Sequence, residues 1–533
     1  MVIGDALRRC AINYPGRLAI QDNYGNHYPA GYSYTYGELF ETVNRLANGF
    51  ISLGLGKGDR VAVQTGTGIG YVLSLLALAK AGIIIAPISP ASMQAEIVYQ
   101  VKDSGARAFV LDADIFTNRV KKIKAKLKSV DVFISIGGDR PCDYDLDGLI
   151  HEGSPDEPPI KVQDDDIATL IYTSGTTGKP KGTPLTHRNW SFSAYIWAAE
   201  LGIHPYTRWL LLLPLNTSGG TGLTLVSMFR GNSLFLSNPD PQKALSIISR
   251  EKITFTQFSP TLLANFIRHP DAENCDFSSI EQWFTSAAPI SENLLKEGAK
   301  FLGKNFIQLY GTTETALLGT VMRPEEVSLE GSLSKRLTSI GRACLGYETK
   351  VIDEEGNPVA AGGIGELAVR GGGVAKAYWN REGASDFKDG WWYSGDLVKV
   401  DEDGFYYVVD RKKDMILTGG MNVSPREIED VVAAHPAVNL VSVIGVPDEK
   451  WGEAVKAIIV LKEGLQATEA EIINYCKERL AGYKRPKSVD FINLSEMPLM
   501  GGGYKVLKRE LRDRYRREYE KNKKEKIDRW GAV

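Results

Sequence analysis

The first third of the chain alternates segments with helical and strand periodicity. The pattern predicts an amphipathic helix over 36–51 and strands at 60–64 and 108–111. The apolar stretch 71–88 is interrupted by Lys80, and a membrane-spanning helix needs about 20 mostly apolar residues. This stretch therefore predicts a buried helix up to Lys80, followed by a strand at 83–86. Strands separated by helical segments indicate crossover units and a largely parallel sheet.

The alternation of helical and strand segments continues to about residue 310, and the pattern then changes. Buried strands are predicted at 167–172, 209–213, 233–236, 255–258 and 306–310. From about residue 339, short alternating segments lie between Gly-rich turns, which is typical of antiparallel hairpins. After Asp410 the pattern predicts a final α+β region with helices at 425–434 and 469–480. We therefore expect an α/β protein with a large N-terminal domain, residues 1–409, and a small C-terminal domain, residues 410–533.

Composition narrows the classes of protein that remain. The 533 residues include 63 Lys plus Arg and 65 Asp plus Glu, so a net charge of −2 gives no electrostatic case for nucleic-acid binding. Five cysteines lie far apart without the spacing of a zinc site, which favours free thiols in a reducing compartment. The N-terminal residues do not resemble a signal peptide. We expect a cytoplasmic protein without an integral membrane segment.

One segment has the composition of a phosphate-binding loop. It follows a predicted strand and reads YTSGTTGKPKG over 172–182. Its glycines leave the backbone free to wrap an anion, while its hydroxyls and lysines supply donors and positive charge. It is not a Walker A loop, because Pro180 stands where that motif has its second glycine. The candidate phosphate ligands are Thr173, Ser174, Gly175, Thr176, Thr177, Gly178 and Lys181.

This loop resembles the signature of the adenylate-forming superfamily, which includes acyl- and aryl-CoA synthetases, carrier-loading adenylation domains and luciferases. Further segments resemble motifs of that family in the same order along the chain. They are QLYGTTET at 308–315, GELAVRGGGVAKAYWN at 365–380, WYSGDL at 392–397, DRKKDMILTGGMNVSPREIE at 410–429 and YKVLKREL at 504–511. The resemblance implies stacked, mostly parallel sheets with a distorted β-barrel in the large domain, and a mobile small domain.

The resemblance also implies a reaction and assigns roles in it. In such enzymes a carboxylate attacks the α-phosphorus of ATP, and two like charges at about 4 Å repel by about 4 kcal/mol at an effective dielectric of about 20. Mg²⁺ and a positioned ammonium reduce this repulsion. Glu314 would hold Mg²⁺, Thr313 would contact the α-phosphate, and Lys505 would contact both the acid and the α-phosphate. The other implied ATP or AMP contacts are Ala287, Ala288 and Pro289 at the adenine, Gln308, Tyr310 and Gly311 in the second motif, and Asp396 and Arg411 at the ribose.

In this family the small domain alternates between two orientations, one for each half-reaction. Lys413 is at the position of the hinge, and Gly419 and Gly420 would approach the pantetheine of coenzyme A. The sequence departs from the common pattern at Asn216 and Thr217, where many relatives have an aromatic residue and His. It departs again at Leu417, where many aryl-CoA ligases carry a lysine, and at Tyr504, which replaces the usual glycine and leaves Lys508 as a second candidate for the lysine. The candidate acid-pocket residues are Asn216, Thr217, Phe258, Ser259 and Leu317.

The sequence therefore predicts an AMP-forming acid–CoA ligase that uses ATP, Mg²⁺ and coenzyme A on a small-molecule carboxylic acid, as a monomer or homodimer. One alternative is a stand-alone adenylation enzyme that loads a carrier protein, since the first half-reaction is the same. Another is a non-catalytic nucleotide-binding protein. That reading is disfavoured because Lys505, Glu314 and Asp396 are all present.

Overall fold

The structure is a computed structural model that describes residues 1–138, 142–173, 179–288, 290–381, 383–500 and 505–530. The chain divides into two compact units, and each is described here by itself. The first comprises residues 1–350 and 368–393, and the second comprises residues 351–367 and 394–533. The sequence predicts a mobile small domain that begins after residue 409. This boundary describes which part of the chain moves, not which part is compact, and it stays a prediction.

Two sheets form the framework of the first unit. The larger has nine described strands in the order β16-β15-β14-β13-β12-β10-β11-β1-β2. Its strands run parallel from β14 to β1, and antiparallel strands close both edges. The strands are β1 (Leu18–Asp22), β2 (Tyr32–Thr35), β10 (Arg208–Leu211), β11 (Ser233–Leu236), β12 (Phe255–Phe258), β13 (Gln282–Thr285), β14 (Phe306–Tyr310), β15 (Thr320–Met322) and β16 (Arg342–Ala343).

The second sheet of this unit has seven described strands in the order β7-β6-β5-β3-β4-β8-β9. All neighbours are parallel except β8 and β9, which form an antiparallel pair. The strands are β3 (Arg60–Gln64), β4 (Ile84–Pro87), β5 (Ala108–Asp112), β6 (Val132–Ile136), β7 (Tyr144–Asp145), β8 (Ile167–Thr173) and β9 (Lys181–Thr186). The prediction of stacked, mostly parallel sheets is confirmed.

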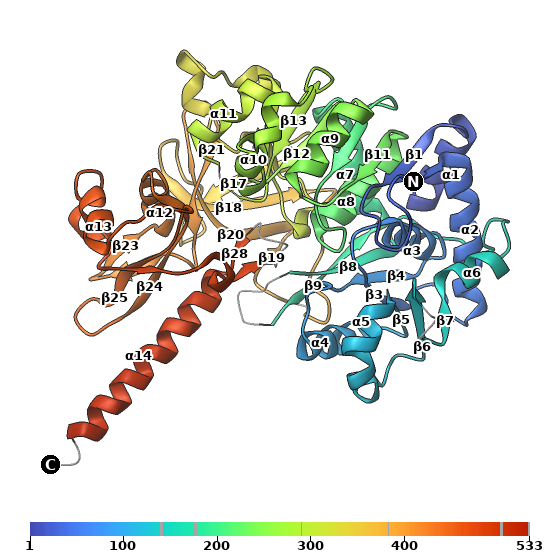
Figure 1. Ribbon diagram of the computed structural model, residues 1–533, viewed down its shortest axis with the longest axis horizontal. Helices are drawn as coiled ribbons and strands as arrows, with labels where there is room; N and C mark the ends of the chain where they lie inside the picture. The colour runs from blue at the N-terminus through green and yellow to red at the C-terminus, as the bar shows by residue number, and fades with distance from the viewer. Residues whose placement is uncertain (139–141, 174–178, 289, 382, 501–504, 531–533) are drawn as a thin grey trace. The chain divides into compact units, whose positions relative to one another are not determined.

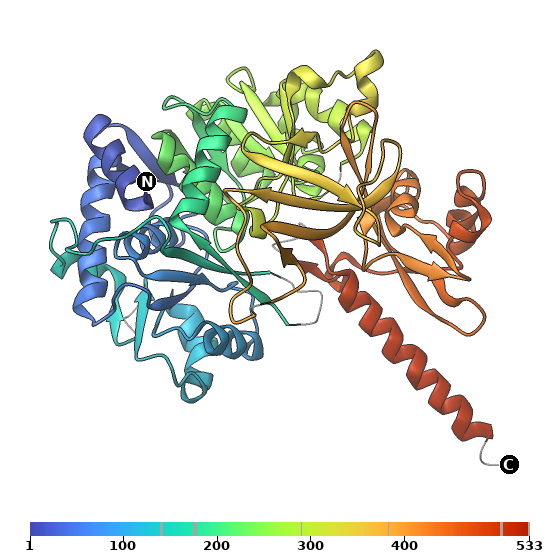
Figure 2. The same cartoon turned by 180° about the vertical axis from the view of Figure 1, so that it is seen from behind.

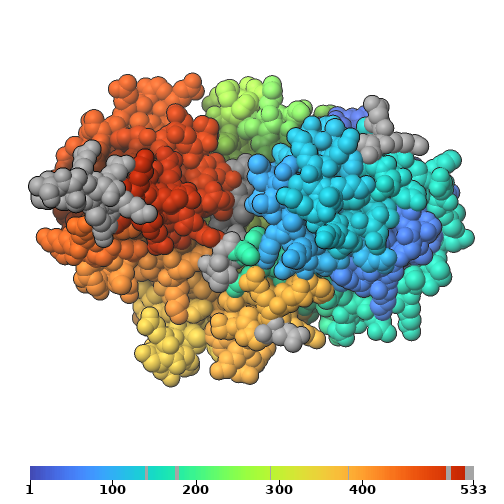
Figure 3. Space-filling model, turned by 90° about the horizontal axis from the view of Figure 1, so that it is seen from below, coloured from blue at the N-terminus to red at the C-terminus, as the bar shows by residue number. Residues whose placement is uncertain are grey.

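Helices fill the space between these sheets and cover their outer faces. Helices α7 and α8 pack against each other between the two sheets (Figures 1 and 2). Helix α4 and the turns at 116–126 pack on the outer face of the seven-stranded sheet and form part of the surface in Figure 3. The helices of this unit are α1 (Ile3–Asn13), α2 (Tyr36–Ser52), α3 (Ile69–Lys80), α4 (Gln94–Ser104), α5 (Ala113–Ile115), α6 (Leu146–Glu152), α7 (His187–Glu200), α8 (Ser218–Arg230), α9 (Pro241–Glu251), α10 (Pro260–Ile267) and α11 (Glu292–Leu302).

The apolar stretch that ends at Lys80 forms a helix that is buried along its whole length, as predicted. The buried lysine is accommodated because its ammonium lies 3.2 Å from Glu157 and 3.8 Å from the centre of the Phe40 ring. Burial lowers the pKa of Lys80 to about 8. Among the helices of the described residues, we find none with the length and apolar character of a bilayer-spanning segment.

A mixed sheet in the order β23-β22-β25-β24, with β26 paired to β25, forms the core of the second unit. Helices α12 and α13 contribute to its apolar core through Ile428, Val432 and Ile472. The strands are β22 (Ile416–Thr418), β23 (Met421–Val423), β24 (Val438–Asp448), β25 (Gly452–Leu461) and β26 (Ser488–Phe491), and the helices are α12 (Pro425–Ala433), α13 (Glu469–Lys477) and α14 (Lys508–Trp530). The small hairpin of β27 (Leu499–Met500) and β28 (Lys505–Val506) precedes α14.

The hairpin region follows the parallel sheets in the sequence. It forms a five-stranded sheet in the order β17-β18-β20-β19, with β21 paired to β20. Its strands are β17 (Tyr347–Ile352), β18 (Ile364–Gly371), β19 (Phe387–Lys388), β20 (Trp391–Val400) and β21 (Tyr406–Arg411). The chain passes between the two units within β17, β18 and β20. The predicted antiparallel pairing is confirmed where β20 meets β19 and β21.

Candidate active site

The candidate phosphate loop is held by an antiparallel strand pair. Strands β8 and β9 pair so that Thr173 lies opposite Lys181, at the two ends of the loop. Ser174, Gly175, Thr176, Thr177 and Gly178 lie outside the described residues. The Lys181 ammonium is buried, 2.9 Å from the Asp386 carboxylate and 4.5 Å from the centre of the Tyr378 ring. The structure thus gives Lys181 a structural partner, and its contact with phosphate stays a prediction.

Glu314 lies at the centre of the described part of the site in the first unit. It belongs to a short 3-10 turn, Thr313–Thr315, that follows strand β14. The residue is only 7% exposed, and its carboxylate accepts a hydrogen bond from the Tyr378 hydroxyl at 2.9 Å. The Thr173 hydroxyl lies 3.5 Å from the same oxygen, Oε1. The structure therefore brings together two predicted site residues that are 141 positions apart in the sequence.

Tyr378 was not predicted as a site residue. Burial and the nearby charge of Glu314 raise the pKa of its phenol above the ordinary value of 10.0, so it remains a proton donor at neutral pH. It lies within the motif 365–380, but local spacing could not show that its hydroxyl reaches Glu314. Its role is to hold one oxygen of that carboxylate and so fix the carboxylate's orientation.

The chain after Glu314 makes an unusual turn. Ala316 and Leu317 both have left-handed backbone, with φ of 48° and 74°. Such conformations cost about 1–3 kcal/mol each for residues other than glycine and persist only where the surroundings hold them. The Leu317 carbonyl here packs so closely on Gly311 that a Cβ at Gly311 would lie 2.0 Å from the Leu317 oxygen. Gly311 is therefore required by the shape of this turn.

The candidate adenine wall follows strand β13. Ala287 and Ala288 are exposed on the surface of the unit, and Ala287 has left-handed backbone with a φ of 72°. Pro289 lies outside the described residues. Gln308 is buried and donates to the Leu337 carbonyl, while Tyr310 ends strand β14 beside Gly311. Small side chains on an exposed turn would leave room for a flat ligand, and the contact of these residues with adenine stays a prediction.

The candidate acid-pocket residues have several different environments. The Thr217 hydroxyl caps helix α8 and the Ser259 hydroxyl caps helix α10, each by accepting a backbone N–H. Phe258 is buried and packs against Phe266 and Trp283. Asn216 and Leu317 are partly exposed and remain available to line a pocket. The caps and the aromatic packing are sufficient to explain Thr217, Ser259 and Phe258 without a contact to the acid.

The second unit carries the candidate ribose site. Antiparallel pairing of β20 and β21 places Asp396 directly opposite Arg411. The guanidinium Nε of Arg411 lies 3.0 Å from the carboxylate, and Asp396 is buried. A carboxylate that can accept two hydroxyl hydrogens beside a cationic donor suits a sugar with adjacent hydroxyl groups. The structure thus brings these two predicted residues together, and their contact with the ribose stays a prediction.

The predicted hinge follows directly after this pair. Backbone hydrogen bonds from the amides of Asp414 and Met415 to the Arg411 carbonyl form a tight turn around Lys413. Burial, followed by the charge of Arg411, lowers the pKa of Lys413 below its ordinary value. The Asp414 carboxylate accepts from Arg512 at 2.8 Å. This ion pair, which sequence reasoning missed, ties the hinge turn to helix α14.

Gly419 and Gly420 form the two-residue turn of the hairpin between β22 and β23. Both have positive φ, 57° and 79°, as a type I′ turn requires. A Cβ at Gly419 would lie 2.8 Å from the Trp451 ring. The turn alone explains both glycines, so their contact with coenzyme A stays a prediction.

The described part of Lys505 is its backbone, which pairs with Met500 in the β27–β28 hairpin. The Lys505 side chain and Tyr504 lie outside the described residues. The second candidate, Lys508, donates to Glu429 at 2.8 Å. Burial raises the pKa of Glu429 even though Lys508 opposes this shift. The Lys508 ammonium thus has a partner within the second unit, and the role of Lys505 stays a prediction.

The described residues contain no group of three or more His, Cys, Asp or Glu side chains that could form a complete metal cage. A single buried carboxylate is nevertheless compatible with Mg²⁺, which is commonly bound by one or two carboxylates together with substrate phosphates. Glu314, with its fixed orientation and a hydroxyl nearby, fits that mode of binding.

Comparison with known proteins identifies the class to which this fold and site belong. The model of the AMP-binding enzyme family matches residues 7–379, and the model of the AMP-binding enzyme C-terminal domain matches residues 427–503. The chain therefore belongs to the AMP-binding enzymes, the adenylate-forming superfamily that includes acyl- and aryl-CoA synthetases. The resemblance stated from the motifs is confirmed.

Particular relatives agree with this membership. A medium/long-chain-fatty-acid–CoA ligase of Mycobacterium tuberculosis is 35% identical, covering 88% of this chain and 84% of its own. A feruloyl-CoA synthase of an Amycolatopsis species is 34% identical, covering 91% and 94%. Among solved structures, an anthranilate CoA ligase in complex with anthranoyl-AMP is 28% identical, with a TM-score of 0.87 and coverage of 97% and 98%. These proteins act on different acids, so similarity alone does not assign a substrate.

Proposed function

We propose that this enzyme activates a carboxylic acid as its acyl-adenylate, with release of pyrophosphate, and then transfers the acyl group to coenzyme A, with release of AMP. The reaction class, an AMP-forming acid–thiol ligase that uses ATP, Mg²⁺ and coenzyme A, is that of its relatives. The observation that carries the assignment of the site is the buried Glu314 carboxylate, oriented by Tyr378 beside the end of the phosphate loop.

In the first half-reaction the described residues of the first unit bind and orient the triphosphate. Thr173 and the loop that follows it hold the β- and γ-phosphates, and Thr313 contacts the α-phosphate. Glu314 is the residue that would hold Mg²⁺, and the ion supplies positive charge where two anions must meet. Tyr378 keeps the carboxylate in one orientation, so that little reorganisation is needed when the nucleotide binds.

The second unit supplies the ribose contacts and the lysine. Asp396 accepts the ribose hydroxyls, and Arg411 both pairs with Asp396 and donates to the sugar. Lys505 brings an ammonium to the carboxylate and the α-phosphate, which lowers the repulsion between them. For the second half-reaction the small domain, residues 410–533, turns about Lys413, and the Gly419–Gly420 turn approaches the pantetheine.

A panel of carboxylic acids with ATP, Mg²⁺ and coenzyme A tests this function. We expect pyrophosphate exchange into ATP with at least one acid and release of AMP that depends on coenzyme A. Release of AMP that is indifferent to coenzyme A would favour transfer to a carrier protein. Absence of exchange with every acid would contradict the assignment of the Thr173 and Glu314 site.

The remaining features of the proposal concern the surroundings of the enzyme. We place it in the cytoplasm, supported by five cysteines that are all unpaired thiols. The near balance of charge supports a small-molecule substrate rather than a nucleic acid. A monomer or homodimer is expected, and light scattering of the purified protein tests this.

A further inference from the structure

The proposed acid site of the first unit has a partly exposed surface, which gives way to buried residues within helix α8. Residues 216–219 and Leu317 are partly exposed, whereas residues 220–229 of the helix are buried. Anything that binds along this surface therefore meets a second, buried layer of side chains directly behind Leu317. The composition of that layer determines how far the pocket can extend.

Trp190 of helix α7 forms this second layer, together with Gly222 of α8. A Cβ built on Gly222 would lie 2.5 Å from Cδ1 of Leu317 and 2.6 Å from Cζ3 of the Trp190 ring. Both side chains therefore lie against the glycine and fill the space that a larger residue would need. Trp190 is completely buried. We call Trp190, Gly222 and Leu317 the Trp190 cluster.

The Trp190 cluster is fixed on both sides. The indole N–H of Trp190 donates to the Thr169 hydroxyl of strand β8 at 3.1 Å. Three residues further along α7, the buried Ser193 hydroxyl donates to the Ala316 carbonyl at 2.6 Å. The indole and the left-handed turn that presents Leu317 are thus held to the same helix, and neither can move aside without losing a buried hydrogen bond.

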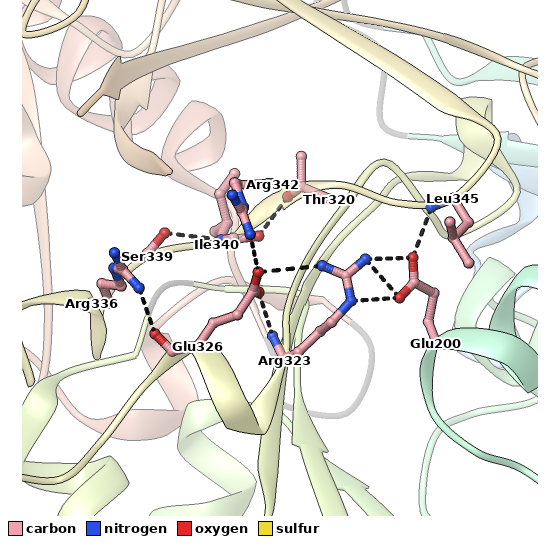
Figure 4. A network of polar contacts seen from close by, with 10 residues as sticks. Glu200, Thr320, Arg323, Glu326, Arg336, Ser339, Ile340, Arg342 and Leu345 are labelled. Carbon is pink, nitrogen blue, oxygen red and sulfur yellow. Dashed lines mark hydrogen bonds and ion pairs between the residues drawn. The ribbon is translucent and has the colours of Figure 1, made fainter. Parts of the chain in front are cut away.

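The far end of α7 is anchored as well. Glu200, the last residue of the helix, has a side chain only 2% exposed and accepts hydrogen bonds from Nε and Nη2 of Arg323, each at 2.8 Å (Figure 4). It also accepts from the Leu345 backbone N–H at 2.7 Å. Figure 4 shows that Arg323 also contacts Glu326, which Arg342 reaches from the other side. Helix α7 is therefore a fixed support for the layer behind the acid pocket.

We propose that Trp190 sets the depth of the acid pocket and limits the substrate to compact carboxylic acids, short-chain or single-ring. This inference rests on the proposed function, because it takes the surface at residues 216–219 and Leu317 as the acid site. A long acyl chain would need a tunnel through the layer behind Leu317. In that layer a buried indole packs against Gly222, so a chain that extends past Leu317 in this direction meets the Trp190 ring.

Matched substitutions on helix α7 test the proposal. Trp190→Phe removes the ring atoms that face Gly222, and Trp197→Phe makes the same change two turns later, where the ring packs on Trp209 and Phe284 instead. Both variants and the parent enzyme are assayed by pyrophosphate exchange with straight-chain acids of increasing length and with benzoates. One methylene in an apolar pocket changes kcat/KM about 10–200-fold.

We expect the parent enzyme to prefer compact acids. We expect Trp190→Phe to raise kcat/KM about tenfold or more for acids one or two methylenes longer, while Trp197→Phe keeps the parental profile. Exchange that is present in all three proteins with one common length profile would overturn the proposal. So would a parent enzyme that activates long-chain acids as well as short ones. Absence of exchange with any acid would instead refute the proposed function.

A second substitution tests the same packing from the opposite direction. Gly222→Ala adds a Cβ that must push Leu317 toward the acid surface, because the Trp190 ring prevents movement the other way. We expect the KM for the acid to rise about tenfold and the KM for ATP to rise much less. Trp190→Phe in the same chain should restore the KM for the acid to within about threefold. A double variant no better than Gly222→Ala, or equal rises in both KM values, would contradict the proposal.

Discussion

Removal of the Tyr378 hydroxyl is the most direct test of the proposed metal site. In Tyr378→Phe the ring and its packing against Phe387 remain, but Glu314 loses the donor that lies 2.9 Å from its Oε1. Glu314 is buried, with 7% of the residue exposed, so water replaces this donor poorly. We expect the carboxylate to lose its fixed orientation and Mg²⁺ to bind less tightly.

The size of this effect follows from the type of hydrogen bond. A hydrogen bond to a charged group contributes about 1.5–3 kcal/mol. Since about 1.4 kcal/mol corresponds to a factor of ten, half-maximal activity should require about 10–100 times more free Mg²⁺. Substitutions of residues that orient metal ligands typically have effects of this size. At saturating Mg²⁺ the rate should recover most of its parental value.

The assay is pyrophosphate exchange at fixed ATP with free Mg²⁺ varied over several orders of magnitude. Tyr347→Phe is a matched control, because it removes another buried tyrosine hydroxyl, one that donates to the Thr315 carbonyl in the same turn. The control should lose stability, by about 0.5–1.5 kcal/mol, without a changed Mg²⁺ requirement. An equal Mg²⁺ dependence for Tyr378→Phe and Tyr347→Phe would refute the assignment of Glu314 as the metal ligand.

Three further predictions concern the lysine, the buried ion pair and the hinge. Lys505→Ala should slow adenylation about 10²–10⁴-fold, equivalent to about 3–5 kcal/mol, yet leave thioester formation from supplied acyl-adenylate nearly intact; equal losses would exclude domain alternation. Glu200→Gln should destabilise the first unit by about 3 kcal/mol, because it removes the buried charge nearest to Arg323 and leaves the longer contact with Glu326, and a denaturation midpoint equal to that of the parent would contradict this. Arg512 holds the pKa of Asp414 below its ordinary value against the effect of burial. The pair therefore stabilises the second unit at pH values above the pKa of an unfolded aspartate, about 3.9. This contribution is lost as the pH falls through the lower pKa of the folded state. Asp414→Asn should remove that part of the acid dependence, and an unchanged acid transition would contradict this reasoning.

Most of the fold could be predicted because its strands have strong local patterns. The apolar runs at 60–64 and 306–310 form β3 and β14 with the predicted bounds, and the amphipathic run at 36–51 forms α2 with one further residue. Strand β13 (Gln282–Thr285) was not predicted: its apolar residues, Trp283 and Phe284, stand between polar Gln282 and Thr285, which gives neither alternation nor a long apolar run. Strand β24 (Val438–Asp448) was also missed, since its burial does not alternate strictly.

The candidate site could be predicted only as far as its residues belong to compact motifs. The phosphate loop, Glu314 and Asp396 lie in such motifs, whereas the Tyr378 hydroxyl reaches Glu314 across 64 positions. Nothing in the sequence indicated that Trp190 belongs to the site, because a tryptophan on a buried helix is usually a core residue. Its relation to Gly222 and Leu317 becomes evident only when three distant segments are seen in contact.

The turn at 313–317 links the two parts of the reaction that must be aligned. Glu314 contacts Tyr378 and the end of the phosphate loop, and three residues later Leu317 packs against Gly222 beside the proposed acid site. The left-handed backbone at Ala316 and Leu317 reverses the chain between these two directions, and Ser193 holds it there. A change that shifts Leu317 therefore strains the segment that carries Glu314. For this reason we expect the depth of the proposed acid pocket and the position of the proposed metal ligand to be coupled through a few bonds, so that substitutions at Leu317 change the substrate range less freely than substitutions at Trp190.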